Sequence, residues 1–397
     1  MNPGSQPVIP AKAGTQGYHG SAPETLGPGL RRDDGIRIAA PAAHYPYLTV
    51  LRGFAAMLVF WYHIIALNWP SFPTSPDILR LLHFGWVGVD LFFVLSGFVI
   101  SASAMQLYDA SPHDAQRVFL KRRAARLLPL YYLTLLMAIL TVQHIMVTHP
   151  WFWGHMAAHL LLVHNLHHNS SGSIGGPNWS VGVEAQFYVV ILLIMPWLSR
   201  LKPWHVLAGG LLLAFVTRGA VLAVAEAQSR EELWRVVYAM QVPTMADAFG
   251  IGMALALLAR RGVLARLSPR QGLALAAGGG ILLYLSFLLL WEMPDYWRHA
   301  RTLVFWRCLP ALCFGMILAG VSRIPAGNGP LMRGFTYLGD ISYGIYLWHL
   351  LVILLLQQSG IAKDNPSLFA ALAVPLVLGL SALTWHALEK PAIKQFR

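Results

Sequence analysis

The apolar run "LTVLRGFAAMLVFWYHIIALN" (48–68) decides the fold class of this chain. An α-helix rises ~1.5 Å per residue, so about 20 apolar residues are enough to cross a bilayer core of ~30 Å. We therefore predict an all-α, polytopic membrane helix bundle with ten transmembrane helices. The ten predicted spans are 48–68, 85–105, 127–148, 179–199, 205–226, 238–259, 272–291, 302–321, 335–357 and 367–388.

The overall composition agrees with a membrane protein. The chain is 56% hydrophobic and only 12% charged, whereas soluble domains contain about 25% charged residues. The net charge of +12 would suggest nucleic acid binding in a soluble protein. Here Lys and Arg gather in short loops, as they do on the cytoplasmic side of membrane proteins. We therefore expect membrane lipid as a partner and no nucleic acid.

Residues 1–45 differ from the rest of the chain. They are rich in Gly, Pro and Ala and have no periodic apolar face. This composition predicts a disordered N-terminal tail, followed by one transmembrane domain over 46–394. The tail also lacks the charged-then-apolar pattern of a signal peptide.

The orientation prediction follows from the basic segments 106–126, 200–204, 260–271 and 322–334. Basic loops stay in the cytoplasm, so both termini are expected there. The segment "WFWGHMAAHLLLVHNL" (151–166) is apolar but short for a crossing. We interpret it as an interfacial or re-entrant helix on the outer side. If it crossed the membrane instead, every later loop would change sides.

Arg52 and His63 are two ionisable residues inside the first apolar run. Eleven residues make about three helical turns, so both side chains share one face, about 16 Å apart along the axis. Arg52 alone would suit a snorkelling anchor, and His63 alone a packed histidine. Together they favour a cavity that is entered from the cytoplasm, because charged groups inside a membrane need a partner or a water-filled space. The neutral imidazole of His63 is a competent general base near pH 7.

The spacing of Arg52 and His63 resembles the signature of the membrane acyltransferase-3 family. Further stretches resemble motifs of the same family in the same order. They are "FGWVGVDLFFVLSGFVIS" (84–101), "FLKRRAARLLPLYYL" (119–133), "NWSVGVEAQFY" (178–188), "YLGDISYGIYLWHLLV" (337–352) and "LEKPAIK" (388–394).

The resemblance covers about residues 48–394 and carries several expectations. It implies ten core spans in the bacterial inner membrane and an O-acyltransferase activity. It implies acyl-CoA as a co-substrate, with acetyl-CoA as the expected donor, and no bound cofactor. The implied acceptor is a hydroxyl of a sugar or of a lipid-linked or exported polysaccharide.

The basic stretch "KRRAARLLP" (121–129) has two interpretations. Arg122, Arg123 and Arg126 could serve only the orientation of the chain, or they could bind phosphate, which guanidinium groups grip with two hydrogen bonds. The family resemblance favours the phosphates of coenzyme A. We therefore expect Arg52, Arg122, Arg123 and Arg126 at the donor site.

Two carboxylates lie near the outer ends of predicted spans. Asp90 and Glu184 need partners inside the membrane. One possibility is structural pairing with Arg218 or Arg307. The other is that Glu184 or Asp90 orients the imidazole of His63, as the carboxylate does in a catalytic triad. The sequence leaves both open, and we keep all three residues as catalytic candidates.

The stretch "SYGIYLWH" (342–349) places Ser342, Tyr346 and His349 on neighbouring helix positions. They could form a polar packing seam, or one wall of an acceptor pocket. We place them in that pocket together with Trp179 and Ser180 of the Trp-Ser motif. The glycines at 85, 88 and 97 are expected to allow close helix approach rather than to bind phosphate.

Two other functions, a di-iron enzyme and a transporter, are alternatives to the acyltransferase. The histidines in "HMAAH" (155–159) and "HNLHH" (164–168) resemble boxes of di-iron desaturases, but no third box follows, so no metal site is expected. A transporter or flippase of a glycan or lipid would suit ten spans equally well. Such proteins are often built from repeated halves, and no internal repeat is evident here.

Overall fold

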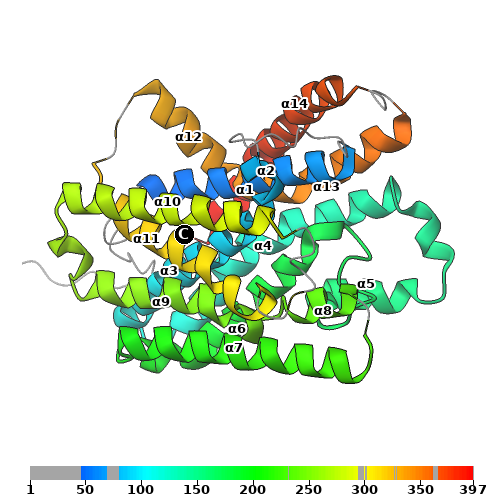
Figure 1. The fold of residues 1–397 in the computed structure, drawn as a ribbon. Coiled ribbons are helices and arrows are strands. Elements are labelled where there is room, and N and C mark those ends of the chain that lie inside the picture. Colours follow the sequence, from blue (N-terminus) through cyan, green and yellow to red (C-terminus); the bar gives the residue numbers. More distant parts are fainter. Residues whose placement is uncertain are drawn as a thin grey trace, which may run out of the picture. The chain divides into compact units, whose positions relative to one another are not determined.

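The computed structural model describes residues 46–68, 80–230, 232–293, 299, 302–325, 327, 329–360 and 365–396. Every regular element in these ranges is helical, which confirms the all-α prediction (Figure 1). The predicted tail at 1–45 lies outside the described residues.

The helices, with their short 3-10 and π segments (η), follow in chain order. They are α1 (Pro46–Asn68), α2 (Arg80–His83), η1 (Gly85–Val87), α3 (Gly88–Ala110), α4 (Ala115–Leu140), η2 (His144–Thr148), α5 (Phe152–Leu160), η3 (His164–Leu166), η4 (Gly176–Asn178), α6 (Trp179–Leu198), α7 (Pro203–Ala227), α8 (Glu232–Tyr238), η5 (Pro243–Met245), α9 (Ala246–Arg260), η6 (Leu264–Arg266), α10 (Pro269–Trp291), η8 (Thr302–Trp306), α11 (Cys308–Val321), α12 (Pro330–Asp340), α13 (Ser342–Ser359), α14 (Pro366–Thr384), η9 (Trp385–Glu389) and α15 (Lys390–Gln395).

Within the described part of the chain, 8 helical segments are long and apolar enough to cross a membrane. A further candidate is α12 with α13, which are bent against each other by 65°. The structure therefore confirms a polytopic helix bundle, with 8 or 9 such spans in place of the predicted ten.

Three predicted spans have different bounds in the structure. The span predicted at 127–148 corresponds to α4, which begins earlier, at Ala115. The helix extends over 115–126 because that segment is rich in Arg, Lys and Ala, which are strong helix formers. The span predicted at 238–259 is the short pair η5 and α9, and α9 alone has 15 residues. Pro243 lies at the start of this pair and cannot donate the backbone hydrogen bond that a continuous helix needs. The span predicted at 335–357 is the bent pair α12 and α13.

The segment 151–166 contains only α5, with 9 residues, and the single turn η3. A helix of this length covers about 14 Å and cannot cross a bilayer core of ~30 Å. This supports the interfacial or re-entrant interpretation of the segment.

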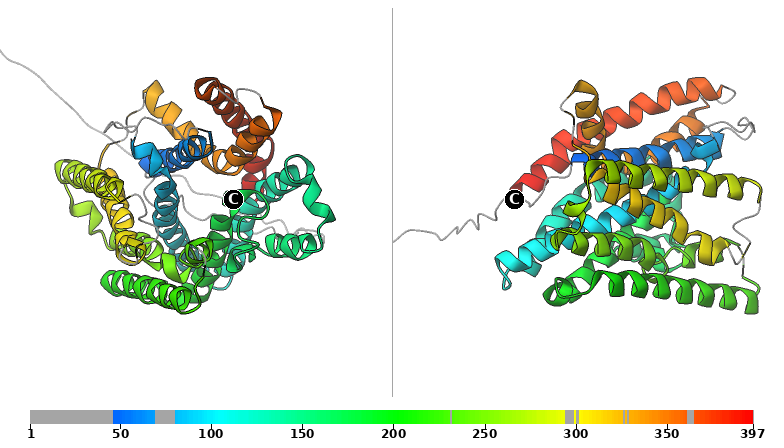
Figure 2. Two further views of the ribbon diagram at one scale, coloured as in Figure 1. Left: turned by 45° about the vertical axis from the view of Figure 1, so that its right-hand side comes forward. Right: turned by 60° about the vertical axis from the view of Figure 1, so that its left-hand side comes forward.

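Helix α3 connects two groups of helices. It packs on α1 on one side and on α9 on the other, and it also contacts α4, α6 and α11 (Figures 1 and 2). Helices α1, α13 and α14 share an apolar core that includes Phe60, Ile345 and Val377. The second group contains α7, α9, α10 and α11, in which α7 packs on α9, α9 on α11 and α11 on α10.

Glycines on α3 and α9 allow these close approaches, as predicted for residues 85, 88 and 97. A Cβ on Gly88 would meet the carbonyl oxygen of Ala55 in α1, and a Cβ on Gly97 would meet that of Phe249 in α9. Gly252 on α9 faces the α3 backbone in return. Small residues at such crossings let helix backbones touch, which is the usual way that membrane helices associate.

Candidate functional site

Two histidines from distant parts of the sequence meet where α1 packs on α13. The Nδ1 atom of His63 lies 3.2 Å from the Nε2 atom of His349. The ring centroids are 4.9 Å apart and the planes are inclined by 50°. His349 is completely buried, whereas His63 remains partly accessible.

The hydrogen-bond network assigns the tautomers of this pair. His349 Nδ1 lies 2.6 Å from the carbonyl oxygen of Tyr346, and His63 Nδ1 lies 2.9 Å from that of Val59. A carbonyl oxygen can only accept, so both Nδ1 atoms carry the proton. His349 Nε2 then accepts from His63, and the Nε2 atom of His63 keeps a free lone pair. The Nε2 atom of His63 can therefore accept a proton, while its Nδ1 side is held by Val59 and His349.

Tyr346 links the histidine pair to the start of α6. Its hydroxyl donates to the carbonyl oxygen of Pro177 at 2.8 Å and lies 2.6 Å from Ser180 Oγ. Its ring lies 5.7 Å from the ring of His349. Three of the residues predicted for the acceptor pocket, Ser180, Tyr346 and His349, are thus in one contact network. Trp179 precedes Ser180 and packs edge-on against Phe93.

Ser342 does not belong to this contact network in the structure. Its side chain is fully buried, and its hydroxyl has no hydrogen-bond partner among the described residues. It lies at the first position of α13, directly after the bend.

The cationic end of the site contains Arg52, Arg123 and Arg126. The charges of Arg126, Glu184 and Glu389 all act on the guanidinium of Arg52. Arg123 lies over the ring of Tyr188, 6.0 Å from its centroid. Three guanidinium groups and the ammonium of Lys390 act here on three carboxylates, Glu184, Asp340 and Glu389, so a net positive charge remains available for an anionic ligand.

Arg122 contacts a different part of the chain from the other predicted donor residues. Its Nε atom donates to the backbone carbonyl of Phe396 at 3.1 Å. The neighbouring Arg123 lies close to Tyr188 and Glu184.

Glu184 lies at the level of the cationic end. Its Oε1 atom accepts hydrogen bonds from Ser96 at 3.1 Å and from Tyr188 at 2.8 Å. His349 is within hydrogen-bond distance of His63, and no hydrogen bond between Glu184 and His63 occurs among the described residues.

Asp90 shows the structural pairing that the sequence allowed. Its carboxylate lies 3.4 Å from Arg307, and the same part of the bundle contains a second buried ion pair, Arg218 with Asp247, at 2.8 Å. Breaking such a buried pair leaves an uncompensated charge, which costs about 3–5 kcal/mol. These contacts explain why acidic and basic side chains are tolerated here, and they give Asp90 no contact with the histidine pair.

The histidine-rich segment contains a second pair of histidines, His159 and His164, which is buried inside the protein. The rings of His159 and His164 stack at 3.9 Å and both side chains are completely buried. His159 Nδ1 lies 3.1 Å from the hydroxyl of Tyr131, and His164 Nε2 donates to the carbonyl oxygen of Asn178 at 3.0 Å. Burial lowers the pKa of His159 to about 2 and that of His164 to about 4. In the described part of the chain, no three His, Cys, Asp or Glu side chains are arranged to hold a metal ion.

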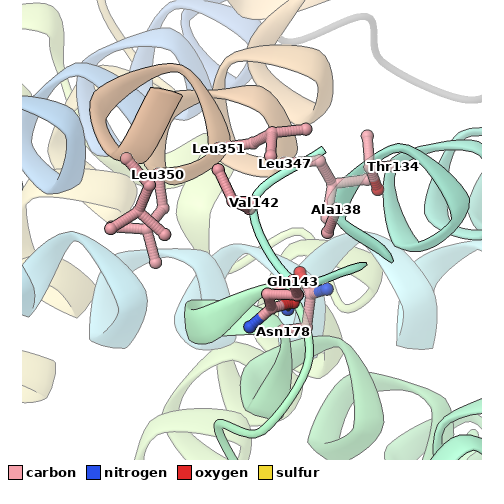
Figure 3. A pocket seen from close by; sticks show the side chains of 10 residues that line it. Thr134, Ala138, Val142, Gln143, Asn178, Leu347, Leu350 and Leu351 are labelled. Atoms are coloured by element: carbon pink, nitrogen blue, oxygen red, sulfur yellow. The ribbon is translucent and has the colours of Figure 1, made fainter. Parts of the chain in front are cut away.

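A small cavity separates the α4 and α13 helices near the turn that precedes α6 (Figure 3). The leucines of α13 form one wall, and the amides of Gln143 and Asn178 lie on the other. Its volume of about 10 Å³ has room for a single water at most. This cavity is too small for a substrate.

Glu389 was missed by the sequence reasoning, and so was the pairing of His63 with His349. Glu389 is 1% exposed, and neither of its carboxylate oxygens has a hydrogen-bond partner among the described residues. The charges of Arg126 and Arg52 act on it. The stretch "LEKPAIK" (388–394) was available as a signal, because a lone carboxylate in an apolar terminal helix needs a partner.

Comparison with known proteins finds relatives named as O-acetyltransferases and as a polysaccharide production protein. The YrhL protein of Bacillus subtilis, named as a candidate peptidoglycan O-acetyltransferase, is 27% identical over 88% of this chain and 55% of its own. Peptidoglycan O-acetyltransferase OatA of Listeria monocytogenes is 26% identical over 88% of this chain and 56% of its own. The exopolysaccharide production protein ExoZ of Rhizobium meliloti is 28% identical over 79% of this chain and 91% of its own. The chain thus spans about half the length of the first two relatives. No solved structure matches it.

The family comparison covers nearly all of the described helices. The family model described as an acyltransferase domain matches residues 45–386, which include His63, His349 and the cationic residues of α4. The chain therefore belongs to the membrane acyltransferase-3 family, as its motifs predicted.

Proposed function

We propose that the chain is an integral membrane O-acyltransferase that moves an acetyl group from acetyl-CoA to a hydroxyl of a sugar or polysaccharide. The names of the relatives support transfer to a glycan. The observation that carries the proposal is the His63–His349 pair, in which the Nε2 atom of His63 keeps its lone pair.

The proposed reaction uses His63 as a general base. Its Nε2 atom takes the proton of the acceptor hydroxyl while the hydroxyl oxygen attacks the thioester carbonyl. The tetrahedral intermediate then breaks its C–S bond, and the coenzyme A thiolate takes the proton from the imidazolium. His349 is the positioning residue, since it fixes the proton of His63 on Nδ1. Glu184 and Asp90 have no step in this scheme.

The proposed donor site is the cationic end of the bundle. Arg52, Arg123 and Arg126 would bind the phosphates of coenzyme A, with Arg122 as a further candidate at its edge. Arg52 lies about 16 Å along α1 from His63, which suits a donor whose phosphates and thioester are at opposite ends. The excess of Lys and Arg in this region supports its placement on the cytoplasmic side of the inner membrane, with both termini there.

The test uses purified protein in proteoliposomes with radiolabelled acetyl-CoA. We expect release of free coenzyme A in the wild-type protein and its loss in His63→Gln. A protein that moves labelled glycan across the membrane without turning over the thioester would be a transporter, and the proposal would be wrong.

A further inference from the structure

A second and much larger cavity lies beside the turn that leads into α6. Its volume is about 770 Å³, which is in the usual range for pockets that bind small ligands, about 300–1,000 Å³. Its walls come from the segment 146–173, from α6 and from the end of α8. The side chains that define its chemistry are Trp151, His155, His168, Asn169, Ser171 and Trp179.

Neighbouring residues connect this cavity to the His63–His349 pair. Trp179 lines the cavity, and the next residue, Ser180, lies 2.6 Å from the hydroxyl of Tyr346. Tyr346 in turn packs beside His349, the partner of His63. Met146, which lines the cavity, follows the C-terminal end of α4, whereas the cationic residue Arg123 lies eight residues after the start of that helix.

The lining of the cavity contains no carboxylate, lysine or arginine. It combines two tryptophan faces with amide, hydroxyl and imidazole groups. The Nδ1 atoms of His155 and His168 have no hydrogen-bond partner among the described residues. Burial lowers the pKa of His155, and the charge of His167 acts in the same direction, so its ring is neutral at pH 7 and can either donate or accept.

These properties match the chemistry of a neutral carbohydrate. The C–H faces of sugar rings pack on aromatic side chains, and their hydroxyl groups both donate and accept hydrogen bonds. A phosphate-bearing ligand would find no cation in this cavity. We infer that the cavity is the binding site for the acceptor, a neutral glycan segment, and that the histidine-rich segment 144–173 builds it. This inference rests on the proposed function and adds to it the location and chemistry of the acceptor.

The test measures saccharide binding to the full-length protein in detergent. The probes are three tritium-labelled neutral tetrasaccharides (chitotetraose, cellotetraose and maltotetraose) and a sulfated heparin tetrasaccharide. At least one neutral probe should bind, and the sulfated probe should bind more weakly. Trp151→Ala should weaken the binding by about tenfold, because it removes one stacking face. His155→Leu should also weaken it, since leucine cannot hydrogen bond.

Trp153→Ala is the matched control. Trp153 is two residues further along the chain, in α5, is 66% exposed and does not line the cavity, so its substitution should leave saccharide binding unchanged. Thermal unfolding and coenzyme A binding check that each variant is folded. Equal affinities in Trp151→Ala and Trp153→Ala, or no binding of any neutral probe to the wild type, would overturn the inference.

The acetyl-CoA assay separates this inference from the proposed function. Thioester turnover without saccharide binding at the cavity would leave the transferase proposal standing and remove the acceptor site. Saccharide binding that depends on Trp151, without thioester turnover, would confirm the glycan site and contradict the transferase proposal.

Discussion

The His63–His349 pair and the His159–His164 pair consist of the same side chains but expose different atoms. In the first pair, one ring is partly accessible and its Nε2 atom makes no hydrogen bond to a described residue. In the second pair, both rings are stacked and fully buried. His159 Nδ1 lies beside the hydroxyl of Tyr131, His164 Nε2 donates to the carbonyl oxygen of Asn178, and His164 Nδ1 is buried without a hydrogen-bond partner among the described residues. An accessible ring nitrogen without a hydrogen-bond partner therefore distinguishes His63 from the buried pair, although the buried pair lies in the histidine-rich part of the sequence.

The largest expected effect is that of His63→Gln. Glutamine keeps a hydrogen bond to His349 but cannot accept a proton near pH 7, and general-base assistance is typically worth ~10²–10⁴ in rate. Acetyl transfer should fall by that factor, while coenzyme A affinity and thermal stability stay near wild type. A stable His63→Gln protein with nearly wild-type turnover would show that the accessible nitrogen of His63 does not act as the base.

The second expected effect is acid lability of the His159–His164 pair. Their pKa values of about 2 and about 4 in the fold lie below the ordinary value of 6.5. The unfolded chain therefore takes up protons first as the pH falls, and the stability that is present above pH ~6.5 is progressively lost. At pH 5 the loss should be about 2 kcal/mol for each histidine.

Thermal unfolding in detergent at pH 7 and pH 5 measures this loss. A His159→Gln/His164→Asn variant should lose less stability on acidification than the wild type, because its side chains do not titrate. Equal losses in both proteins would mean that the stacked pair is not the acid-sensitive element.

A third, smaller effect should appear at the cationic end, away from both pairs. Arg123→Gln and Arg126→Gln should each weaken coenzyme A binding by about 1.5–3 kcal/mol for every charged hydrogen bond lost. Titration calorimetry with coenzyme A measures this affinity. Arg117→Gln, an exposed cation on the same helix, is the control and should bind normally. The same measurement on Arg122→Gln decides whether that residue belongs to the donor site.

The smallest effect is expected for Ser180→Ala. This change removes one hydrogen bond to Tyr346, while Tyr346 keeps its bond to Pro177. A stability loss of about 0.5–1.5 kcal/mol is expected, with a much smaller change in transfer rate than for His63→Gln. A rate loss as large as that of His63→Gln would mean that the Ser180 hydroxyl itself takes part in the chemistry.

Much of the fold could be predicted because hydrophobic length alone identifies most spans. The spans at 48–68, 179–199 and 205–226 agree closely with α1, α6 and α7. The bend between α12 and α13 could not be predicted, since no proline marks it. It occurs beside Gly339, where a Cβ would strike the backbone of Thr49 in α1. That constraint comes from a distant helix and leaves no trace in local periodicity.

The sequence could propose individual residues for the candidate site, but it could not predict which of them contact one another. Helical periodicity places His63 on the face of Arg52 and His349 near Tyr346. Periodicity does not predict that α1 packs on α13, so the contact between the two histidines could not be predicted. The same limit explains why a carboxylate was considered as the partner of His63, and why Glu389 was passed over.

The backbone contact between α3 and α9 has a mechanical consequence. Where Gly97 and Gly252 bring the two backbones together, neither helix can slide past the other without collision. The half of the bundle that contains α3 and α9 should therefore behave as a stiff frame that moves little. The 65° joint between α12 and α13 is held in the same way, because Gly339 lies directly against the backbone of Thr49 in α1. The start of the helix that holds His349 is therefore fixed against the helix that holds His63.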